Sequence, residues 1–86
     1  MIKKENLFEL TTPDLGDAEK IELAIWYVKP EENIEKGQEI LELVTDKAAF
    51  PVESPYSGRL IEICIPKGSN VQRGQVLGVM EILQDL

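Results

Sequence analysis

Apolar and polar residues alternate over short stretches of this chain, and turn-forming residues separate the stretches. No long stretch combines the helical spacing of apolar positions with capping residues at its ends. Branched and aromatic residues gather instead in runs bounded by glycine and proline, which is typical of an all-β protein. The pattern predicts strands at residues 7–11, 20–28, 38–45, 48–53, 59–65 and 75–83.

Strict alternation fails at two pairs of neighbouring apolar residues inside the predicted strands, Ile40-Leu41 and Leu60-Ile61. β-bulges, or strands that cross from one sheet to another in a small sandwich, account for such pairs. Pro51 also lies inside a predicted strand, and proline cannot donate the hydrogen bond that a central strand needs. We therefore expect the strand with Pro51 at a sheet edge or at a bulge.

A shift of 37 residues lays part of the first half of the chain on the second. The apolar spacing of the two halves is similar, and the identical residues include Asn33, Gly37 and Gln38 on Asn70, Gly74 and Gln75. Two like halves of this kind predict a structure with a pseudo-twofold axis. The same shift places Lys47 on Gln84, so we expect the turn with Lys47 and the carboxyl end of the chain at opposite poles.

The chain is small and acidic. Its 86 residues predict a single domain over residues 1–86, with a core at about residues 7–83 and no room for a large catalytic cleft. Apolar residues make up 43% and charged residues 29%, as in a soluble globular protein. The net charge of −7 argues against nucleic acid and against a membrane surface as partners.

The chain contains no histidine, which removes the commonest general base, every nucleophile paired with histidine and most zinc sites. Its one cysteine, Cys64, excludes an internal disulfide, and we expect it as a small buried side chain in a strand. The apolar run at the start of the chain is too short for a signal peptide or a membrane span. We expect a cytoplasmic protein or a mature domain.

One hairpin carries a lysine where a glycine would turn more easily. Asp46 and Lys47 are the central pair of a tight turn between two predicted strands, in the sequence LELVTDKAAFPVE. A primed turn would force positive φ on both residues, so we expect a type I turn, although it matches strand twist less well. Composition alone makes Lys47 an ordinary solvated lysine on a surface turn.

The sequence around this turn resembles a known family. ELVTDKAAFPVESPYSG, with PDLGD upstream and SNVQRGQVLGVME downstream, resembles the lipoyl domain of 2-oxo acid dehydrogenase complexes, which is part of the biotinyl/lipoyl carrier family. The resemblance runs from about Leu10 to Ile82. It implies an all-β fold, a flattened barrel or sandwich of two small antiparallel sheets with internal pseudo-twofold symmetry, and it places the lysine at the tip of one hairpin.

The resemblance implies roles for Lys47 and its neighbours. Lys47 would carry lipoic acid as an amide on its ε-amine, and Asp46 and Ala48 would be read by the modifying enzyme. Biotin carriers of the same family place a methionine on each side of the lysine, so these flanks favour lipoate. An amide resists hydrolysis better than an ester, and the long flexible stem of lysine makes the arm mobile.

The resemblance also implies partners. A lipoate ligase or lipoyl transferase would attach the cofactor, since a lysine amine is protonated near neutral pH and does not acylate itself. A thiamine-dependent 2-oxo acid decarboxylase, an acyltransferase core and dihydrolipoyl dehydrogenase would then act on the lipoyl arm. The domain would be a carrier and not an enzyme, in the cytoplasm or, in a eukaryote, the mitochondrial matrix. Whether it is a free-standing protein or part of a dihydrolipoyl acyltransferase stays open.

A loop near the lysine is the expected recognition site of the decarboxylase. The resemblance places Asp17, Ala18 and Glu19 in this role, in a stretch between Gly16 and Trp26 that is one residue shorter than the family pattern. The 2-oxo acid that the complex would use is left open by this departure.

Glycines and one glutamate mark the expected turns. Gly37, Gly58 and Gly74 are predicted as turn residues with positive φ. Glu31 stands where the family commonly has a turn glycine and where the second half has Gly68, so we expect the first-half turn to take another shape.

Two neighbouring aromatic residues, Trp26 and Tyr27, lie in a predicted strand. Core or half-buried sheet packing is the commoner role for aromatic residues in such a position, and contact with a partner is the alternative. We assign both residues to packing.

Three other functions remain open from the sequence. They are a lipoyl carrier of the glycine cleavage type, a biotin carrier, and a β-sandwich that docks to a partner without being modified. The glycine cleavage carrier is longer and has additional helical segments, and biotin carriers differ at the flanks of Lys47. A modification assay separates the unmodified module from the carrier.

Overall fold

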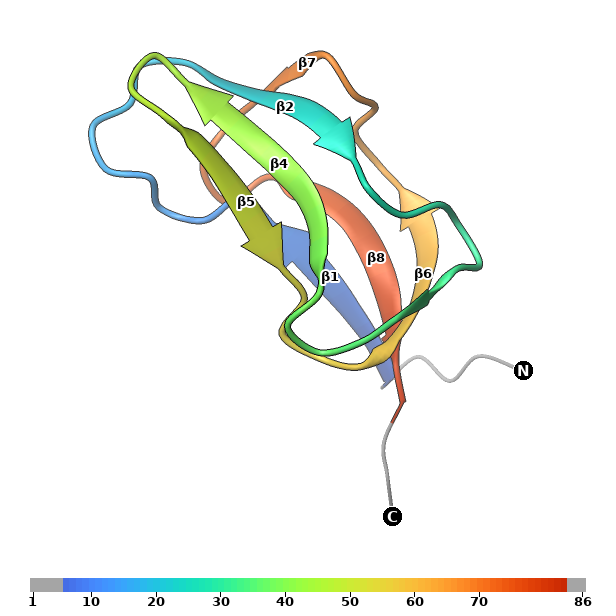
Figure 1. Cartoon of the computed structure of the whole chain (residues 1–86). Helices are drawn as coiled ribbons and strands as arrows, with labels where there is room; N and C mark the ends of the chain where they lie inside the picture. Colours follow the sequence, from blue (N-terminus) through green and yellow to red (C-terminus); the bar gives the residue numbers. More distant parts are fainter. Residues whose placement is uncertain (1–5, 84–86) are drawn as a thin grey trace.

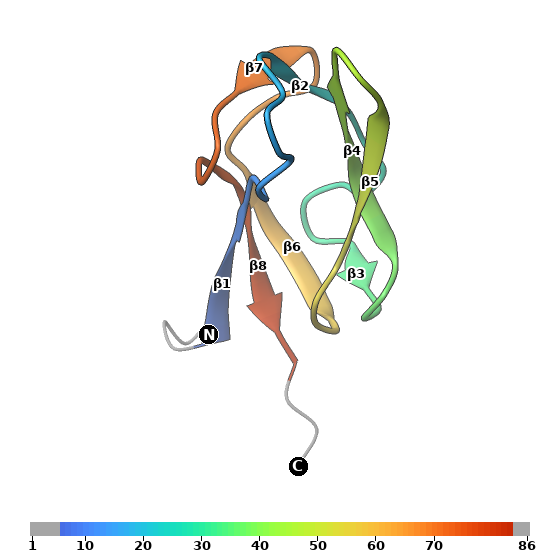
Figure 2. The ribbon, with the colours of Figure 1, turned by 90° about the vertical axis from the view of Figure 1, so that its left-hand side faces the viewer.

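The computed structural model describes residues 6–83, which form an all-β sandwich of two four-stranded antiparallel sheets (Figure 1). The first sheet has the strand order β1-β8-β6-β3, and the second has the order β5-β4-β2-β7. Figure 2 shows them as two facing layers that do not close into a barrel. The strands are β1 (Leu7–Thr11), β2 (Ile21–Trp26), β3 (Asn33–Ile34), β4 (Glu39–Thr45), β5 (Ala49–Glu53), β6 (Gly58–Ile63), β7 (Ser69–Val71) and β8 (Val76–Ile82).

The predicted strands are confirmed, and each differs from the observed one by at most two residues at either end. The sequence pattern did not predict β3 and β7, because a strand of two or three residues is too short to show alternation of apolar and polar residues. The all-β class and the antiparallel pairing are as expected.

Both predicted irregularities are present as bulges. The register between β4 and β5 shifts between Glu39 and Leu41, and the register between β6 and β8 shifts between Leu60 and Glu62. A bulge lets two neighbouring apolar residues face the core. β5, which contains Pro51, is an edge strand of the second sheet, as its proline requires.

The core lies between the two sheets and is filled by aliphatic side chains from both. Its most deeply buried large side chains are Leu23, Val28, Ile40, Leu41, Leu43, Leu60, Leu77 and Met80. β5 is the one strand in which every residue is exposed or only half-buried. The β4–β5 hairpin is therefore anchored in the core mainly through β4.

The predicted repeat is confirmed by the strand bounds. The bounds of β2 (Ile21–Trp26) and β6 (Gly58–Ile63) differ by 37 residues at both ends, and those of β4 and β8 differ by the same number. The bulge after Leu23 in β2 has its counterpart after Leu60 in β6. β3 pairs with β6 and β7 pairs with β2, so each half of the chain completes the sheet of the other.

The turn at Glu31 has the same shape as the turn at Gly68, so the expectation of another shape is wrong. The φ angle is 76° at Glu31 and 86° at Gly68. The Glu31 amide donates to the carbonyl of Leu60 at 2.7 Å, and the Gly68 amide donates to the carbonyl of Leu23 at 2.6 Å. The hydrogen bond from Glu31 to Leu60, which joins the two halves, thus holds Glu31 in a left-handed conformation that glycine adopts more readily.

Gly37 and Gly74 are confirmed as turn residues, with φ angles of 88° and 76°. Gly58 is not a turn residue of this kind, because it begins β6 and does not have positive φ. A Cβ atom at Gly58 would collide with the backbone of Glu81 in β8. The close approach of two paired strands explains this glycine.

Trp26 is half-buried, as expected, and its indole Nε1 donates to the carbonyl of Ile65 at 2.8 Å. Tyr27 and its pseudo-twofold counterpart Cys64 are both exposed, Tyr27 to 48%. The predictions that Tyr27 packs in the sheet and that Cys64 is buried are therefore wrong. Tyr27 points outward because Trp26 and Val28, on either side of it, already occupy inward positions.

The hairpin with Lys47 and the ends of the described chain lie at opposite poles, as predicted (Figure 1). β4 turns into β5 at one pole, beside the loop between β1 and β2. β1 begins and β8 ends at the other. Gln84, the predicted counterpart of Lys47, lies outside the described residues.

Replacing Glu31 by glycine is expected to raise the free energy of unfolding by about 0.5 to 1 kcal/mol, because the left-handed conformation strains a side chain but not glycine. The matched change Gly68→Ala is expected to lower it by about 1 kcal/mol. Open space surrounds Gly68, so only its φ opposes a side chain. Urea unfolding of the three proteins measures both effects. Equal stability of Glu31→Gly and the wild type would show that the ion pair of Glu31 with Arg59 offsets the strain.

Candidate functional site

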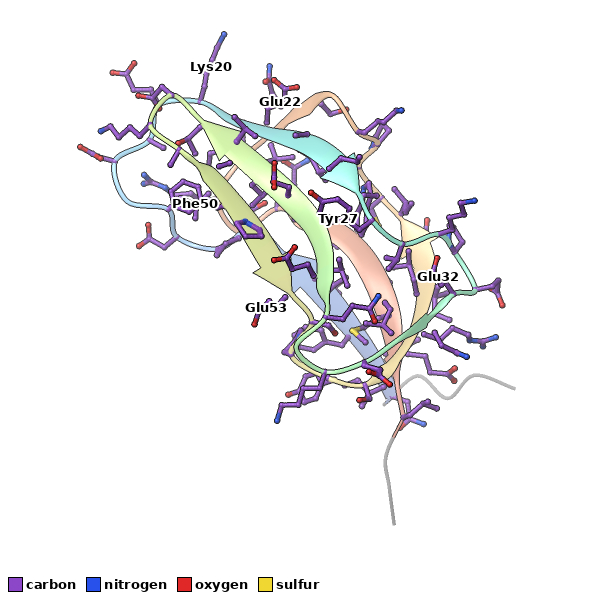
Figure 3. All side chains as sticks on the ribbon, in the orientation of Figure 1. Lys20, Glu22, Tyr27, Glu32, Phe50 and Glu53 are labelled. Carbon is purple, nitrogen blue, oxygen red and sulfur yellow. The ribbon has the colours of Figure 1, made fainter. Side chains whose placement is uncertain are left out.

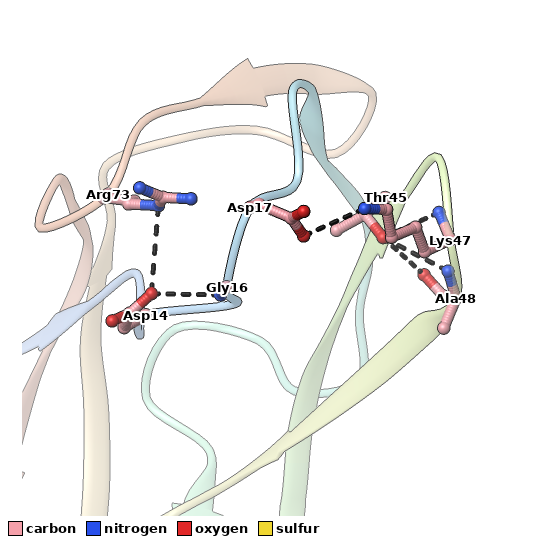
Figure 4. Close-up of polar contacts among 7 residues, drawn as sticks. All are labelled: Asp14, Gly16, Asp17, Thr45, Lys47, Ala48 and Arg73. Atoms are coloured by element: carbon pink, nitrogen blue, oxygen red, sulfur yellow. Dashed lines mark hydrogen bonds and ion pairs between the residues drawn. The ribbon is translucent and has the colours of Figure 1, made fainter.

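The tip of the β4–β5 hairpin runs from Thr45 to Ala48, and the Thr45 side chain organises it (Figure 4). The Thr45 amide donates to the carbonyl of Ala48 at 2.9 Å, which closes the two strands. The amides of Lys47 and Ala48 both donate to Thr45 Oγ1, at 3.0 and 3.1 Å, and the Thr45 hydroxyl donates to the Ala48 carbonyl at 3.3 Å. The hydroxyl thus serves as the acceptor at the centre of the turn.

The φ angles of the turn agree with the type I turn expected from the sequence and exclude a primed turn. Among the described residues, Glu31 is the non-glycine residue with positive φ, so Asp46 and Lys47 have negative φ. Types I′, II and II′ each need positive φ at one or both central positions, which leaves type I among the four common types. Both central side chains are exposed, so the turn presents them to solvent.

The Lys47 amine reaches across to the loop between β1 and β2. Its Nζ lies 2.9 Å from Asp17 Oδ1, with the two side chains 54% and 89% exposed (Figure 4). Within the described part of the chain, the ion pair of Lys47 is with Asp17 and not with its sequence neighbour Asp46. An exposed pair of this kind adds little stability, so the amine stays available at the surface.

The loop that carries Asp17 is fixed by contacts on its amino-terminal side. Asp14 Oδ1 accepts a hydrogen bond from the Gly16 amide at 3.0 Å, and the same oxygen lies 3.9 Å from Arg73 Nε. Leu15 packs against the core. The carboxylate of Asp17 is therefore placed opposite the hairpin by the fold rather than by the ion pair alone.

The residues expected to meet a decarboxylase have different surroundings. Asp17 and Glu19 are exposed, whereas Ala18 is half-buried and packs against the core. Ala18 and Glu19 border an open depression of about 360 Å³ next to β7 and Arg73. The structure thus brings Asp17 to Lys47 and gives Ala18 a packing contact.

The contact with Lys47 lowers the pKa of Asp17 below its usual value. The hydrogen bond from the Lys47 ammonium group is the main cause, a hydrogen bond from the Asp17 backbone amide is the second, and the charge of Arg73 adds the least. Because the pKa is lower in the folded state, any stability from this pair is present above the unfolded pKa of Asp17. It is lost as the pH falls through the folded value.

Two residues of this site were missed by the sequence reasoning. Thr45 could have been found, because serine and threonine hydroxyls commonly accept the backbone amide two residues further on in turns. Arg73 reaches Asp14 from the turn between β7 and β8, and nothing in the sequence near either residue indicates that contact.

Other features of the described residues offer no competing site. No group of three or more histidine, cysteine, aspartate or glutamate side chains there is placed to hold a metal ion. No helix in that part of the chain is long and apolar enough to cross a membrane. Partial desolvation first, and then the charges of Glu62 and Glu9, raise the pKa of the Cys64 thiol, so it is a weak nucleophile near neutral pH.

Thr45→Val keeps the shape of the side chain but removes the acceptor of the Lys47 and Ala48 amides. We expect the free energy of unfolding to fall by about 1 kcal/mol, and hydrogen exchange at these two amides to become faster. Thr45→Ser keeps the hydroxyl and is the matched control, with both properties expected near the wild type. Unchanged exchange in the valine variant would mean that the backbone alone sets the turn.

A family model described as "Biotin-requiring enzyme" (Biotin_lipoyl) matches residues 8–80 of the chain. The match begins in β1 and ends in β8. It therefore covers both sheets, the hairpin with Lys47 and the loop with Asp17.

Three relatives are acyltransferase components of 2-oxo acid dehydrogenase complexes. The chain is 30% identical over 71 residues to the dihydrolipoyllysine-residue acetyltransferase component of the pyruvate dehydrogenase complex of Bacillus subtilis, and 34% over 73 residues to that of Cupriavidus necator. It is 32% identical over 74 residues to the dihydrolipoyllysine-residue succinyltransferase component of the 2-oxoglutarate dehydrogenase complex of Bartonella vinsonii. The matches cover 81%, 85% and 85% of this chain but only 16%, 13% and 18% of the relatives.

Two solved structures share the fold. The lipoyl domain of the 2-oxoglutarate dehydrogenase complex from Azotobacter vinelandii superposes with a TM-score of 0.72 at 26% identity, over 84% of this chain and 92% of that one. A single-chain, multi-domain long-chain acyl-CoA carboxylase superposes with a TM-score of 0.78 at 13% identity, over 99% of this chain and 8% of that one, which shows a common fold alone. Taken with the acyltransferase relatives, these matches show that the chain belongs to the biotin/lipoyl attachment family and is a lipoyl domain, a carrier rather than a catalytic domain.

Proposed function

We propose that Lys47 carries lipoate as an amide on its ε-amine. The observation that supports this most directly is its position. Lys47 is the lysine, among the described residues, that lies in the turn between two strands paired with each other, β4 and β5. The other described lysines lie in loops, or in turns that join strands of different sheets.

The surroundings of Lys47 fit an acylated side chain. Its side chain is 54% exposed, and its one ion-pair partner among the described residues is the exposed carboxylate of Asp17. Acylation turns the ammonium group into a neutral amide, so this pair must break. The cost is small, because exposed pairs add little stability.

The flanks of Lys47 favour lipoate over biotin. Asp46 and Ala48 stand where biotin carriers have methionine, and both are exposed beside the amine for an attaching enzyme to read. The family model covers both kinds of carrier, whereas the names of the acyltransferase relatives specify a dihydrolipoyllysine residue.

The proposed role is to carry acyl groups and reducing equivalents between the active sites of a 2-oxo acid dehydrogenase complex. When bound, lipoate supplies a dithiolane that takes up an acyl group with two electrons and passes both on. The protein contributes a rigid base for the arm, because Thr45 fixes the turn and β4 anchors it in the core. Tethering raises the local concentration of the arm at each enzyme.

The partners that this role requires are an attaching lipoate ligase or lipoyl transferase, a thiamine-dependent 2-oxo acid decarboxylase, an acyltransferase core and dihydrolipoyl dehydrogenase. Asp17, next to Lys47, and Glu19, at the neighbouring depression, are the exposed loop residues proposed to meet the decarboxylase. Ala18 between them would act by holding the loop against the core.

Incubation with lipoate, ATP and a lipoate ligase is expected to raise the intact mass of the domain by one lipoyl amide, and Lys47→Ala is expected to abolish the gain. Lys20→Ala removes an exposed lysine near the same pole (Figure 3) and should be modified like the wild type. Biotin, ATP and a biotin ligase are expected to give no gain, because Asp46 and Ala48 are not methionine. No gain with lipoate, or a gain that survives Lys47→Ala, would overturn the proposal.

Acylation of Lys47 is also expected to raise the pKa of Asp17 toward its usual value, because the charged ammonium donor that lowers it becomes a neutral amide. Lys47→Met should have the same effect without any enzyme. NMR titration of the Asp17 carboxyl carbon measures the change, and Lys20→Met is the control. An Asp17 titration that is the same in Lys47→Met and the wild type would show that the ion pair does not persist in solution.

A further inference from the structure

The outer face of the second sheet carries charge of one sign around two exposed apolar side chains. Every charged residue in β2, β4, β5 and β7 is a glutamate. Ile25 and Tyr27 stand among them, 40% and 48% exposed. Figure 3 looks onto this surface. We call it the acidic face, and its residues are Glu22, Glu39, Glu42, Glu53, Ile25 and Tyr27.

The acidic face opposes local stability. Glu39 and Glu53 are direct cross-strand neighbours in β4 and β5, a position in which like charges repel and weaken the pairing. None of the ion pairs between described residues includes a member of the acidic face. A repulsive pair without a compensating cation in the fold indicates a role outside the fold.

The pseudo-twofold axis provides a comparison within the same molecule. The first sheet has the same scaffold, and the counterpart of the Glu39–Glu53 pair there is Thr11 opposite Val76, two uncharged residues. The scaffold therefore does not require acidic residues at these positions.

The counterpart of Glu22 differs even more. At a shift of 37 residues it is Arg59, which pairs with Glu31 at 2.9 Å and with Glu81 at 3.1 Å. Arg59 thus partly neutralises the negative charge on the first sheet. On the second sheet, Glu22 at the equivalent position has no ion pair with another described residue and can interact with solvent or a partner.

Tyr27 adds an apolar and hydrogen-bonding centre to this charge. Its hydroxyl donates to Glu42 Oε1 at 3.3 Å, which orients the ring over the sheet. Exposed aromatic residues inside a rim of charge are typical of the centre of a protein interface. Partial desolvation first, and then the Glu42 charge, raise the pKa of Tyr27, so the phenol stays neutral and able to donate.

The acidic face runs up to the hairpin tip, because β4 and β5 belong to both. Glu39 lies six residues before Thr45, which is roughly 20 Å along an extended strand. A standard interface buries about 800 Å² on each partner, a patch roughly 30 Å across. A protein that binds at the Lys47 tip and extends from there along β4 and β5 with an interface of this size also covers the acidic face.

We propose that the acidic face is the docking surface for the enzyme that attaches lipoate, which would present arginine or lysine side chains around an apolar centre. This proposal rests on the proposed function of Lys47. The attaching enzyme must bring its reactive centre within bonding distance of the Lys47 amine, so it must contact the tip and the strands behind it. Enzymes that act on the far end of the arm can stay further from the sheet. Charge complementarity then requires a basic partner surface.

The test compares two double variants with the same change in net charge. Glu39→Gln/Glu53→Gln removes charge from the acidic face, and Glu9→Gln/Glu62→Gln removes exposed charge from strands of the first sheet. The probe is a purified lipoate ligase with lipoate and ATP, and the KM for the domain and kcat are measured at low and high salt. We expect the first variant to raise KM about fivefold to tenfold with kcat within twofold, and to weaken the salt dependence. The second variant should stay within twofold.

A stability measurement excludes misfolding as the cause. Removing the Glu39–Glu53 repulsion should leave the midpoint of thermal unfolding at or above that of the wild type, so weaker modification cannot come from an unfolded domain. Tyr27→Ala gives an independent reading and is expected to raise KM as well, with Tyr27→Phe in between.

Two results would overturn the inference while leaving Lys47 as the attachment residue. One is equal KM values for the two double variants. The other is a Glu39→Gln/Glu53→Gln variant that is lipoylated as fast as the wild type but is reductively acylated more slowly by a decarboxylase, because the acidic face would then dock the decarboxylase and not the attaching enzyme. If the wild type is not lipoylated at all, the proposed function fails and this inference fails with it.

Discussion

Each half of the chain completes the sheet of the other, and the rest of the structure depends on this exchange. β3 pairs with β6 and β7 with β2, and the amides of Glu31 and Gly68 donate to Leu60 and Leu23 in the opposite half. Neither half contains a complete sheet, so the core between the sheets forms only when both are present. The same bonds impose the backbone of the two connecting turns, which explains why Glu31 takes a φ that its own side chain disfavours.

Of the two strand pairs that the pseudo-twofold axis relates, β4–β5 and β8–β1, only the first is joined by a turn that can carry the lipoyl arm. At one pole β4 runs directly into β5 through the turn that Thr45 holds, whereas their counterparts at the other pole, β8 and β1, are paired but are not joined in sequence. Lys47 therefore lies at the end of a hairpin whose β4 strand is fixed by fully buried leucines. A rigid base under an exposed amine suits a tether, because the free motion is then confined to the arm.

The sequence predicted much of this arrangement, and the misses have physical causes. Long strands, bulges and the repeat were readable because apolar periodicity is local, and the repeat carried the symmetry. Glu31 was misjudged because its conformation is set by Leu60, far away in the sequence. Thr45 left a readable signal as a turn-organising hydroxyl, whereas Arg73 meets Asp14 only in the fold. The proximity of Asp17 to Lys47 followed from the family resemblance, and no local pattern indicates it.

Two features of this domain are locally unfavourable: the positive φ of Glu31 and the cross-strand pair of like charges, Glu39 and Glu53. The fold explains only the first. Glu31 at positive φ is held by a bond between the halves, and Gly68 at the equivalent place shows that the fold uses this backbone shape twice. The Glu39–Glu53 pair has no such explanation, since the equivalent place in the first sheet holds Thr11 and Val76. The duplicated scaffold distinguishes these two features. The positive φ of Glu31 occurs in both halves and therefore serves the fold, whereas the Glu39–Glu53 pair occurs in one half only and is available for recognition by a partner. Lys47 belongs to the second group, and the Glu39–Glu53 pair of the acidic face lies on β4 and β5, the two strands that the turn with Lys47 joins.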